Sequence, residues 1–251
     1  GAAFIRGAWM NERIFRDFPE LKTVDTREIG SDRTIKSYVL RTAGLKEREA
    51  RAIERYWPRY GLSFKDEPLD LPALFGNDKP VVVEIGFGMG AATAHIARTR
   101  GGYNYLGLEV FLTGIAKLLN IVGKEDLDNI RIMRFDAVEV LKHMIVDGSI
   151  AGFHIFFPDP WPKKRHVKRR LIQKPFAELL ARKLVKGGYI YCVTDWQEYA
   201  EQMLDVFDSI PGLKNPHRGF APPIPWRLET SFERKGVAKE HPINEVWVEK
   251  L

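Results

Sequence analysis

The chain has 251 residues, of which 45% are hydrophobic and 29% are charged, and this balance excludes an intrinsically disordered protein. Its one cysteine, Cys192, excludes an intrachain disulfide and gives no sign of an oxidising compartment, so we expect a cytoplasmic protein. No window approaches the ~18 apolar residues that a membrane helix needs, so we expect no membrane partner. The formal net charge of +6 raises the question of an acidic partner.

The first part of the chain has one clear helical pattern, at residues 46–57. Pro58 is expected to end this helix, because proline lacks the N–H that a helix interior uses. Residues 1–9 precede the first methionine, and we leave them out of the fold prediction as a remnant of expression. Residues 63–79 combine prolines with acidic residues and are interpreted as a linker.

From residue 80 onward, short apolar runs alternate with helical patterns, and this alternation predicts an α/β fold with a doubly wound sheet. We expect an N-terminal extension over 1–62 and one α/β domain over 63–251. Strands are predicted at 81–85, 104–110, 129–135, 153–157, 189–194 and 243–249, and helices at 91–100, 111–122, 137–146, 175–185 and 196–210.

Ligands of doubly wound sheets bind at the carboxyl ends of the strands, so the residues after each strand are the candidates for a site. Gly86, Gly88 and Gly90 follow the first strand, near Glu84, and predict a turn that lets a nucleotide-type cofactor approach the backbone. Glu109 ends the second strand about 20 residues later, where an acid accepts hydrogen bonds from ribose hydroxyls.

Two further acids follow the third and fifth strands, and each has two interpretations. Asp136, followed by Ala137, could contact an adenine ring or could cap the next helix. Asp195 lies between Thr194 and Trp196, where capping is again the alternative to a role in binding. The residue types alone do not decide between these interpretations.

Asp159 follows the fourth strand in the unusual sequence Pro158-Asp159-Pro160-Trp161. Because the residue before a proline is pushed toward extended geometry, Pro160 keeps Asp159 out of a helix. The two prolines stiffen the loop, and we expect them to hold the carboxylate outward. This position is interpreted as functional.

The segment that follows, KKRHVKRR at 163–170, carries the excess of positive charge. It holds six Lys and Arg residues and no acid, and the remaining 33 Lys and Arg match the 33 Asp and Glu of the chain. A local patch of this kind suits a polyanion such as RNA, although a solvated loop or an import signal has the same composition. The acids at the strand ends, by contrast, suit a cationic ligand such as S-adenosylmethionine (SAM).

Six segments together resemble the motifs of the bacterial tRNA (guanine-N7)-methyltransferase family. They are EIGFGMG (84–90), LEV (108–110), DA (136–137), FPDPWPKKRHVKRR (157–170), TDWQEYAE (194–201) and TSFERKG (230–236). The Asp-Pro-Trp-Pro-Lys block is highly specific, and the glycine turn is not. Val167 stands where the family frequently has His, and Lys235 where Arg is usual.

The resemblance implies a class I SAM-dependent methyltransferase domain with a mostly parallel, seven-stranded, Rossmann-like sheet. It further implies transfer of the SAM methyl group to N7 of guanosine 46 in the tRNA variable loop, leaving S-adenosyl-L-homocysteine. The implied partner is tRNA, with no obligate protein partner, no metal, and a monomeric or homodimeric state.

The family's functional positions map onto this chain in four groups. Asp159 matches the catalytic position and also belongs to the cofactor group. The cofactor group is Glu84, Gly86, Gly88, Gly90, Glu109, Asp136, Ala137 and Asp159. The substrate group is Lys163, Asp195, Thr230, Ser231, Phe232 and Glu233, and the RNA group is Arg165, His166, Val167, Lys168, Arg169 and Arg170.

Three alternatives remain at the level of the residues. A dinucleotide-dependent oxidoreductase shares the glycine turn and Glu109 but does not account for the Asp-Pro-Trp-Pro block. A non-catalytic RNA-binding module would not need acids at the strand ends. An amino-methyltransferase acting on adenine or cytosine has a related Asp-Pro loop.

Three aromatic residues are candidate surfaces for stacking a base, namely Trp161, Trp196 and Phe157. Core packing is the alternative for Phe157.

Overall fold

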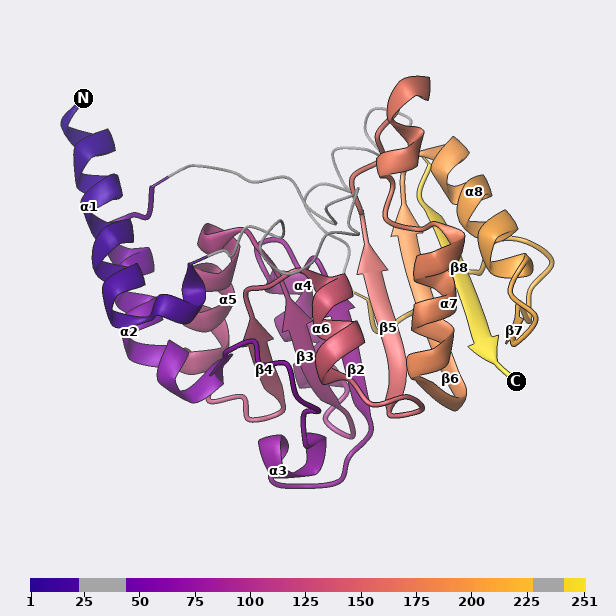
Figure 1. The fold of residues 1–251 in the computed structure, drawn as a ribbon, viewed down its shortest axis with the longest axis horizontal. Coiled ribbons are helices and arrows are strands. Elements are labelled where there is room, and N and C mark those ends of the chain that lie inside the picture. The colour runs from indigo at the N-terminus through magenta and orange to yellow at the C-terminus, as the bar shows by residue number, and fades with distance from the viewer. Residues whose placement is uncertain (23–43, 228–241) are drawn as a thin grey trace.

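The computed structural model describes residues 1–22, 44–227 and 242–251, and these residues form a twisted sheet with helices on both faces (Figure 1). Within the described residues the sheet has eight strands in the order β1-β4-β3-β2-β5-β6-β8-β7. The strands are β1 (Gly61–Leu62), β2 (Val81–Ile85), β3 (Asn104–Leu108), β4 (Ile130–Met133), β5 (Ile150–Phe156), β6 (Leu184–Thr194), β7 (Leu213–Lys214) and β8 (Asn244–Lys250).

The pairing of the strands confirms the predicted fold class. The strands from β1 to β6 pair in parallel, and β8 joins β6 and β7 in antiparallel pairs. The count exceeds the expected seven strands by β1, which has two residues at the edge of the sheet beside β4. A pair of residues is too short to show an alternating pattern in a sequence.

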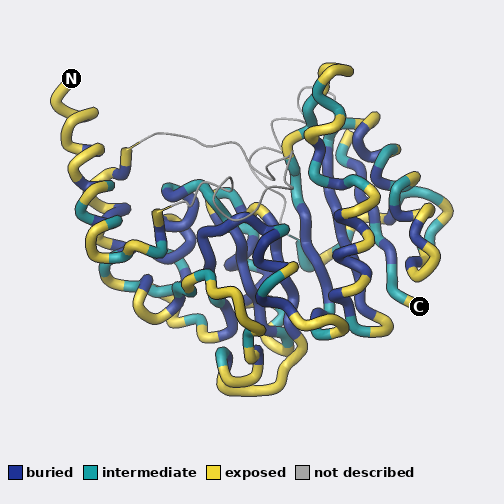
Figure 2. Tube along the Cα trace, in the orientation of Figure 1, coloured by how far each residue is buried: buried dark blue, intermediate teal, exposed yellow. Residues whose placement is uncertain are grey.

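Helices cover the two faces of the sheet and enclose a separate core on each side. They are α1 (Ala2–Asp17), η1 (Pro19–Leu21), α2 (Glu47–Tyr60), α3 (Leu71–Phe75), α4 (Ala91–Thr99), α5 (Leu112–Lys124), α6 (Ala137–Met144), η3 (Lys164–Arg169), α7 (Lys174–Lys183) and α8 (Gln197–Asp208). The strands are buried along most of their length, whereas exposed residues gather on the outer helix faces and the loops (Figure 2).

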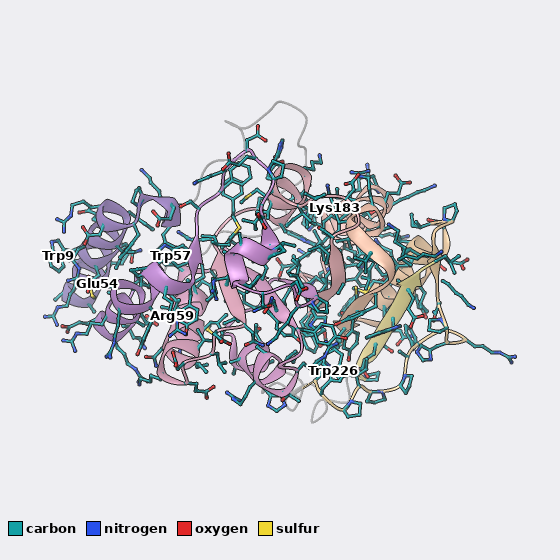
Figure 3. All side chains as sticks on the ribbon, turned by 90° about the horizontal axis from the view of Figure 1, so that it is seen from below. Trp9, Glu54, Trp57, Arg59, Lys183 and Trp226 are labelled. Carbon is teal, nitrogen blue, oxygen red and sulfur yellow. The ribbon has the colours of Figure 1, made fainter. Side chains whose placement is uncertain are left out.

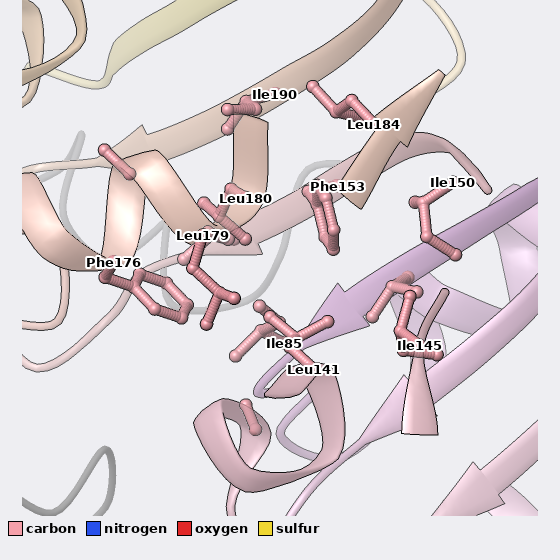
Figure 4. Close-up of a cluster of buried hydrophobic side chains, with 14 of the residues drawn as sticks. Ile85, Leu141, Ile145, Ile150, Phe153, Phe176, Leu179, Leu180, Leu184 and Ile190 are labelled. Atoms are coloured by element: carbon pink, nitrogen blue, oxygen red, sulfur yellow. The ribbon is translucent and has the colours of Figure 1, made fainter. Parts of the chain in front are cut away.

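The first core lies beneath α6, α7 and α8. Phe153 of β5 and Ile190 of β6 pack there against Leu180 of α7, and Leu141 of α6 meets Ile85 of β2 (Figure 4). Burial of such side chains stabilises each by roughly 1.5–3 kcal/mol relative to exposure. This packing gives β2, β5 and β6 a rigid base for the loops at their carboxyl ends.

The second core joins the N-terminal helices to the other face of the sheet. Trp57 of α2 is buried, and its indole N–H donates to Glu20 over 2.8 Å. The hydroxyl of Tyr60 donates to the carbonyl of Val122 in α5 over 3.1 Å. Figure 3 shows Trp9 near the outer end of the molecule and Trp57 closer to the sheet. The predicted extension therefore packs directly on the α/β layers.

Two local predictions are corrected. The helix predicted to end at Pro58 continues to Tyr60, because Pro58 lies in its last turn and the fixed φ of proline is compatible with a helix. The predicted linker contains α3, which Asp70 caps by accepting from the amide of Ala73. Residues 2–9, which the fold prediction left out, lie in α1, where Gly7 is buried against Gly44. Among the described residues, no helix is long and apolar enough to cross a membrane.

Candidate active site

Five parallel strands end on the same edge of the sheet, and each brings an acidic residue to it. The spatial order of the strands is β4, β3, β2, β5 and β6. The acids that end or follow these strands are, in that order, Asp136, Glu109, Glu84, Asp159 and Asp195. The topology thus gathers at one edge the carboxylates that lie up to 111 residues apart in the sequence.

The turn after β2 has the geometry expected of a cofactor-binding loop. Gly86, Gly88 and Gly90 have φ angles of 77°, 60° and 82°, in the left-handed region that favours glycine. Helix α5 packs closely on this turn, since a Cβ atom on Gly114 would lie 1.9 Å from the Gly88 carbonyl oxygen. Cβ atoms on Gly86 or Gly88 would meet nothing within 4 Å. The turn is therefore packed on one side and open on the other.

Glu109 links this glycine turn to the end of β3. One carboxylate oxygen accepts the amide of Gly88 over 2.7 Å, and the other accepts the amides of Val110 and Phe111 over 2.7 and 3.1 Å. Such bonds from backbone N–H groups favour a charged carboxylate. The contact with ribose implied for Glu109 stays a prediction beside this structural role.

Glu84 is a buried carboxyl group beside the glycine turn, with 3% of its surface exposed. The hydroxyl of Thr93 lies 2.9 Å from each of its oxygens. Burial raises the pKa of Glu84 to about 7. The nearby Glu109 adds to this rise, and the hydrogen bond from Thr93 opposes it. A buried carboxylate of this kind gains most from a cationic ligand.

Thr93 is a functional candidate that the sequence interpretation missed. It is the third residue of α4, and its side chain is buried against the sheet. Its signal was a hydroxyl in the first turn of the helix, nine residues after an acid on the preceding strand. A lone threonine in a helix is too common for this signal to have been specific.

The two acids with a capping alternative behave differently. Asp136 caps α6, because its Oδ1 accepts the amides of Val138 and Glu139 over 2.9 and 3.3 Å. The adenine contact implied for Asp136 and Ala137 stays a prediction. Helix α8 begins after Trp196 and has no side-chain cap, so capping does not account for Asp195.

Asp159 is exposed on a loop whose two ends have unusual backbone geometry. Phe157 has a φ of 51° and Trp161 a φ of 43°, values that side-chain-bearing residues rarely adopt. Strained positions of this kind cost of order 1–3 kcal/mol each and concentrate at functional sites. The amide of Phe157 donates to Val193 of β6 over 2.7 Å and holds the loop's first end. Strained residues therefore lie on both sides of Asp159 in the sequence.

The basic segment forms η3, drawn at the top of Figure 1 beyond the end of β5. Lys163, Lys164, Arg165, Lys168 and Arg169 are exposed, whereas His166 and Val167 are half-buried. The guanidinium of Arg169 lies 5.2 Å from the centre of the Trp161 ring. This surface brings five cations next to the loop that carries Asp159.

Arg170 corrects the prediction that the whole segment faces RNA. Its side chain is 1% exposed, and its guanidinium is directed into the protein, where Pro160, Gln202 and Glu198 surround it. A buried guanidinium with protein partners is not available as a surface phosphate contact. The predicted substrate positions Thr230, Ser231, Phe232 and Glu233 lie outside the described residues.

The three aromatic candidates for stacking a base also differ. Phe157 packs against the second core, which supports the core-packing alternative, and Trp196 packs against the first core. Trp161 is half-buried and makes an edge contact with His166, with ring centres 5.7 Å apart. In the part of the chain that the structure describes, no cluster of three or more His, Cys, Asp or Glu could hold a metal ion.

Comparisons with known proteins show the family. A family model described as "Putative methyltransferase" matches residues 78–246. A tRNA (guanine-N(7)-)-methyltransferase from Neisseria gonorrhoeae (strain NCCP11945) is 47% identical over 90% of this chain and 94% of its own length. Another, from Acidovorax sp. (strain JS42), is 50% identical over 85% of each chain. The chain belongs to the tRNA (guanine-N7)-methyltransferase family.

A solved structure agrees with this family at the level of the fold. The 16S rRNA methyltransferase KamB superposes with a TM-score of 0.51 at 14% identity, covering 74% of this chain and 96% of that one. Membership of the tRNA (guanine-N7)-methyltransferase family confirms the resemblance that the Asp-Pro-Trp-Pro-Lys block indicated. It also sets aside the dinucleotide-dependent oxidoreductase.

The backbone strain at Trp161 predicts an unusual ranking of substitutions. The free energy of unfolding of Trp161→Gly should be about 1 kcal/mol higher than that of Trp161→Ala, because glycine adopts a φ of 43° without a Cβ clash. Denaturant unfolding of both variants measures this difference. The matched control is Trp196, whose φ of −91° should make its Gly variant less stable than its Ala variant. An Ala variant at least as stable as the Gly variant at position 161 would contradict the assigned strain.

Proposed function

We propose that this protein transfers the methyl group of SAM to N7 of guanosine 46 in the variable loop of tRNA. The observation that carries the proposal is the place of Asp159, on a strained loop between the open glycine turn and the exposed cations of η3. The relatives named as tRNA (guanine-N(7)-)-methyltransferases support the substrate and the target atom.

The residues at the strand ends fit SAM, which carries a sulfonium and an ammonium. Glu84 is a buried carboxyl group whose partner, Thr93, is a neutral hydroxyl, so a cation beside it would favour its charged form. The open side of Gly86 and Gly88 leaves room for a ligand to approach the backbone. We assign Glu84, Gly86, Gly88, Gly90, Glu109, Asp136, Ala137 and Asp159 to this binding site.

The chemistry requires positioning more than acid–base catalysis. When bound, SAM supplies an electrophilic methyl group, whose bond to sulfur breaks as the guanine N7 lone pair forms the new bond. N7 carries no proton, so the protein needs no general base, and positive charge develops on the purine. The carboxylate of Asp159 would accept hydrogen bonds from guanine N1–H and the exocyclic amine and would stabilise that charge.

The exposed cations of η3 would hold the tRNA backbone. Each neutralised phosphate contributes about 0.9 to the dependence of log K on log salt on a duplex. Lys163, Arg165, Lys168 and Arg169 are exposed and suited to such contacts. Asp195, at the neighbouring strand end, would lie with Lys163 on the substrate side. The target base must leave its stack to reach this edge, and Trp161 is the best placed aromatic side chain to receive it.

Identification of the methylated nucleoside tests the proposed function directly. Labelled SAM and unmodified tRNA are incubated with the protein, and the digested product should be 7-methylguanosine. A transcript with adenosine in place of guanosine 46 is the matched control and should remain unlabelled. Label in methylated adenosine or cytidine would support an amino-methyltransferase instead, and absence of label in either transcript would contradict methyl transfer to tRNA.

The raised pKa of Glu84 predicts a pH dependence of cofactor binding. Binding of SAM should strengthen as the pH rises through about 7, because the carboxyl group loses its proton and then attracts a cation. Calorimetric titrations between pH 6 and 8 measure this change. Thr93→Val removes a bond that lowers the pKa, so it should move the midpoint to higher pH.

Glu84→Gln is the matched control for this titration. It should bind SAM more weakly at pH 8 and lose the component of the pH dependence centred near 7. An identical pH dependence in the wild type and in Glu84→Gln would show that another group is responsible.

A further inference from the structure

Arg170 is the cation of the basic segment that faces the protein interior. Its Nε donates to the carbonyl oxygen of Pro160 over 2.7 Å, and its Nη1 donates to Oε1 of Gln202 over 2.6 Å. Its Nη2 lies 3.7 Å from the carboxylate of Glu198, within ion-pair range but too far for a hydrogen bond. The guanidinium also lies 5.1 Å from the centre of the Tyr199 ring. The side chain is 1% exposed, so the protein encloses the guanidinium.

The carbonyl that Arg170 binds belongs to the loop that carries Asp159. Pro160 directly follows this acid, and its carbonyl lies in the peptide that leads into Trp161, with its φ of 43°. Pro160 has no N–H, so its carbonyl is the one backbone polar group that this residue offers to a partner. A charged donor at 2.7 Å is a strong bond of this kind.

The other end of the contact is anchored on α8. Tyr199 is buried, and its hydroxyl accepts the amide of Ile172 over 2.9 Å. The side-chain amide of Gln202 donates to the carbonyl of Ile172 over 3.0 Å. Both backbone polar groups of Ile172, two residues after Arg170, are therefore hydrogen-bonded to side chains of α8. That helix begins two residues after Asp195.

We propose that Arg170 is a positioning residue for the methyl transfer, which fastens the Asp159 loop to α8 rather than binding a tRNA phosphate. Its bond to Pro160 holds the strained end of the loop, and its contacts with Gln202 and Glu198 connect that loop to the helix that follows Asp195. Asp159 and Asp195 are thereby kept at a fixed distance from each other. This role rests on the proposed function for its effect on catalysis, although the contacts themselves do not.

Kinetics of Arg170→Lys distinguish a positioning residue from a phosphate contact. Lysine keeps the charge, but one ammonium on a flexible stem does not reproduce the planar fork that joins Pro160 to Gln202. The kcat at saturating tRNA and SAM should fall roughly tenfold to a hundredfold, with little change in the KM for tRNA. Gln202→Leu removes the acceptor from α8 without changing the charge and should lower kcat in the same way. Wild-type kcat in both variants would overturn the proposal.

The salt dependence of tRNA binding is a second measurement that distinguishes a positioning residue from a phosphate contact. Arg170→Gln should keep the wild-type slope of log K against log salt. Lys168→Gln, the same loss of charge on an exposed side chain, should lower that slope by about 0.9. A slope lowered to the same extent in Arg170→Gln, with kcat unchanged, would make Arg170 a phosphate contact.

Hydrogen exchange tests the contact without requiring activity. In the peptide over 157–163 the amides belong to Phe157, Asp159, Trp161 and Lys163, since the other three residues are prolines. Their exchange should accelerate in Arg170→Lys and Gln202→Leu and stay at the wild-type rate in Arg165→Lys, the same change on an exposed side chain. Faster exchange in a protein that makes no 7-methylguanosine would overturn the proposed function and retain this contact. Unchanged exchange in an active protein would overturn the contact's role alone.

Discussion

The loop from Phe157 to Trp161 is held in a backbone conformation that its residues do not favour, and the site depends on the bonds that hold it. Phe157 is held by Val193 of β6, and Pro160 is held by the buried Arg170. Strained geometry persists only where the surroundings determine it from several sides. Here it leaves Asp159 exposed at the point where the carboxyl edge of the sheet meets a cationic surface.

Two opposite electrostatic surfaces adjoin each other at this loop, and the topology explains how they coexist. The acids lie at the ends of parallel strands, where Glu109 and Asp136 are stabilised by backbone N–H groups and Glu84 is buried. The cations lie on η3, beyond the sheet. In the proposed function, a cationic methyl donor and an anionic RNA would approach from different sides and meet at Asp159. The absence of a proton on guanine N7 accounts for a site built from positioning groups.

Much of this architecture could be predicted from the sequence, because parallel strands buried on both faces read as apolar runs and their loops converge on one edge. The glycine turn and the candidate acids were predictable for that reason. The burial of Arg170 was not, since eight residues with six cations indicate a solvated segment and nothing local shows that Gln202 and Tyr199 enclose the last of them. The pairing of Thr93 with Glu84 and the two-residue β1 likewise depend on tertiary packing, which a sequence pattern does not record.

We propose that Asp159 acts through its charge on the purine as the methyl group arrives. Single-turnover methylation of tRNA by Asp159→Asn, with SAM and enzyme in excess, measures this most directly, because asparagine keeps the size of the side chain and removes the charge. We expect a rate lower by roughly a hundredfold with tRNA affinity retained, as for other groups that stabilise developing charge. A rate equal to that of the wild type would contradict the claim and leave Asp159 as a residue that orients the base.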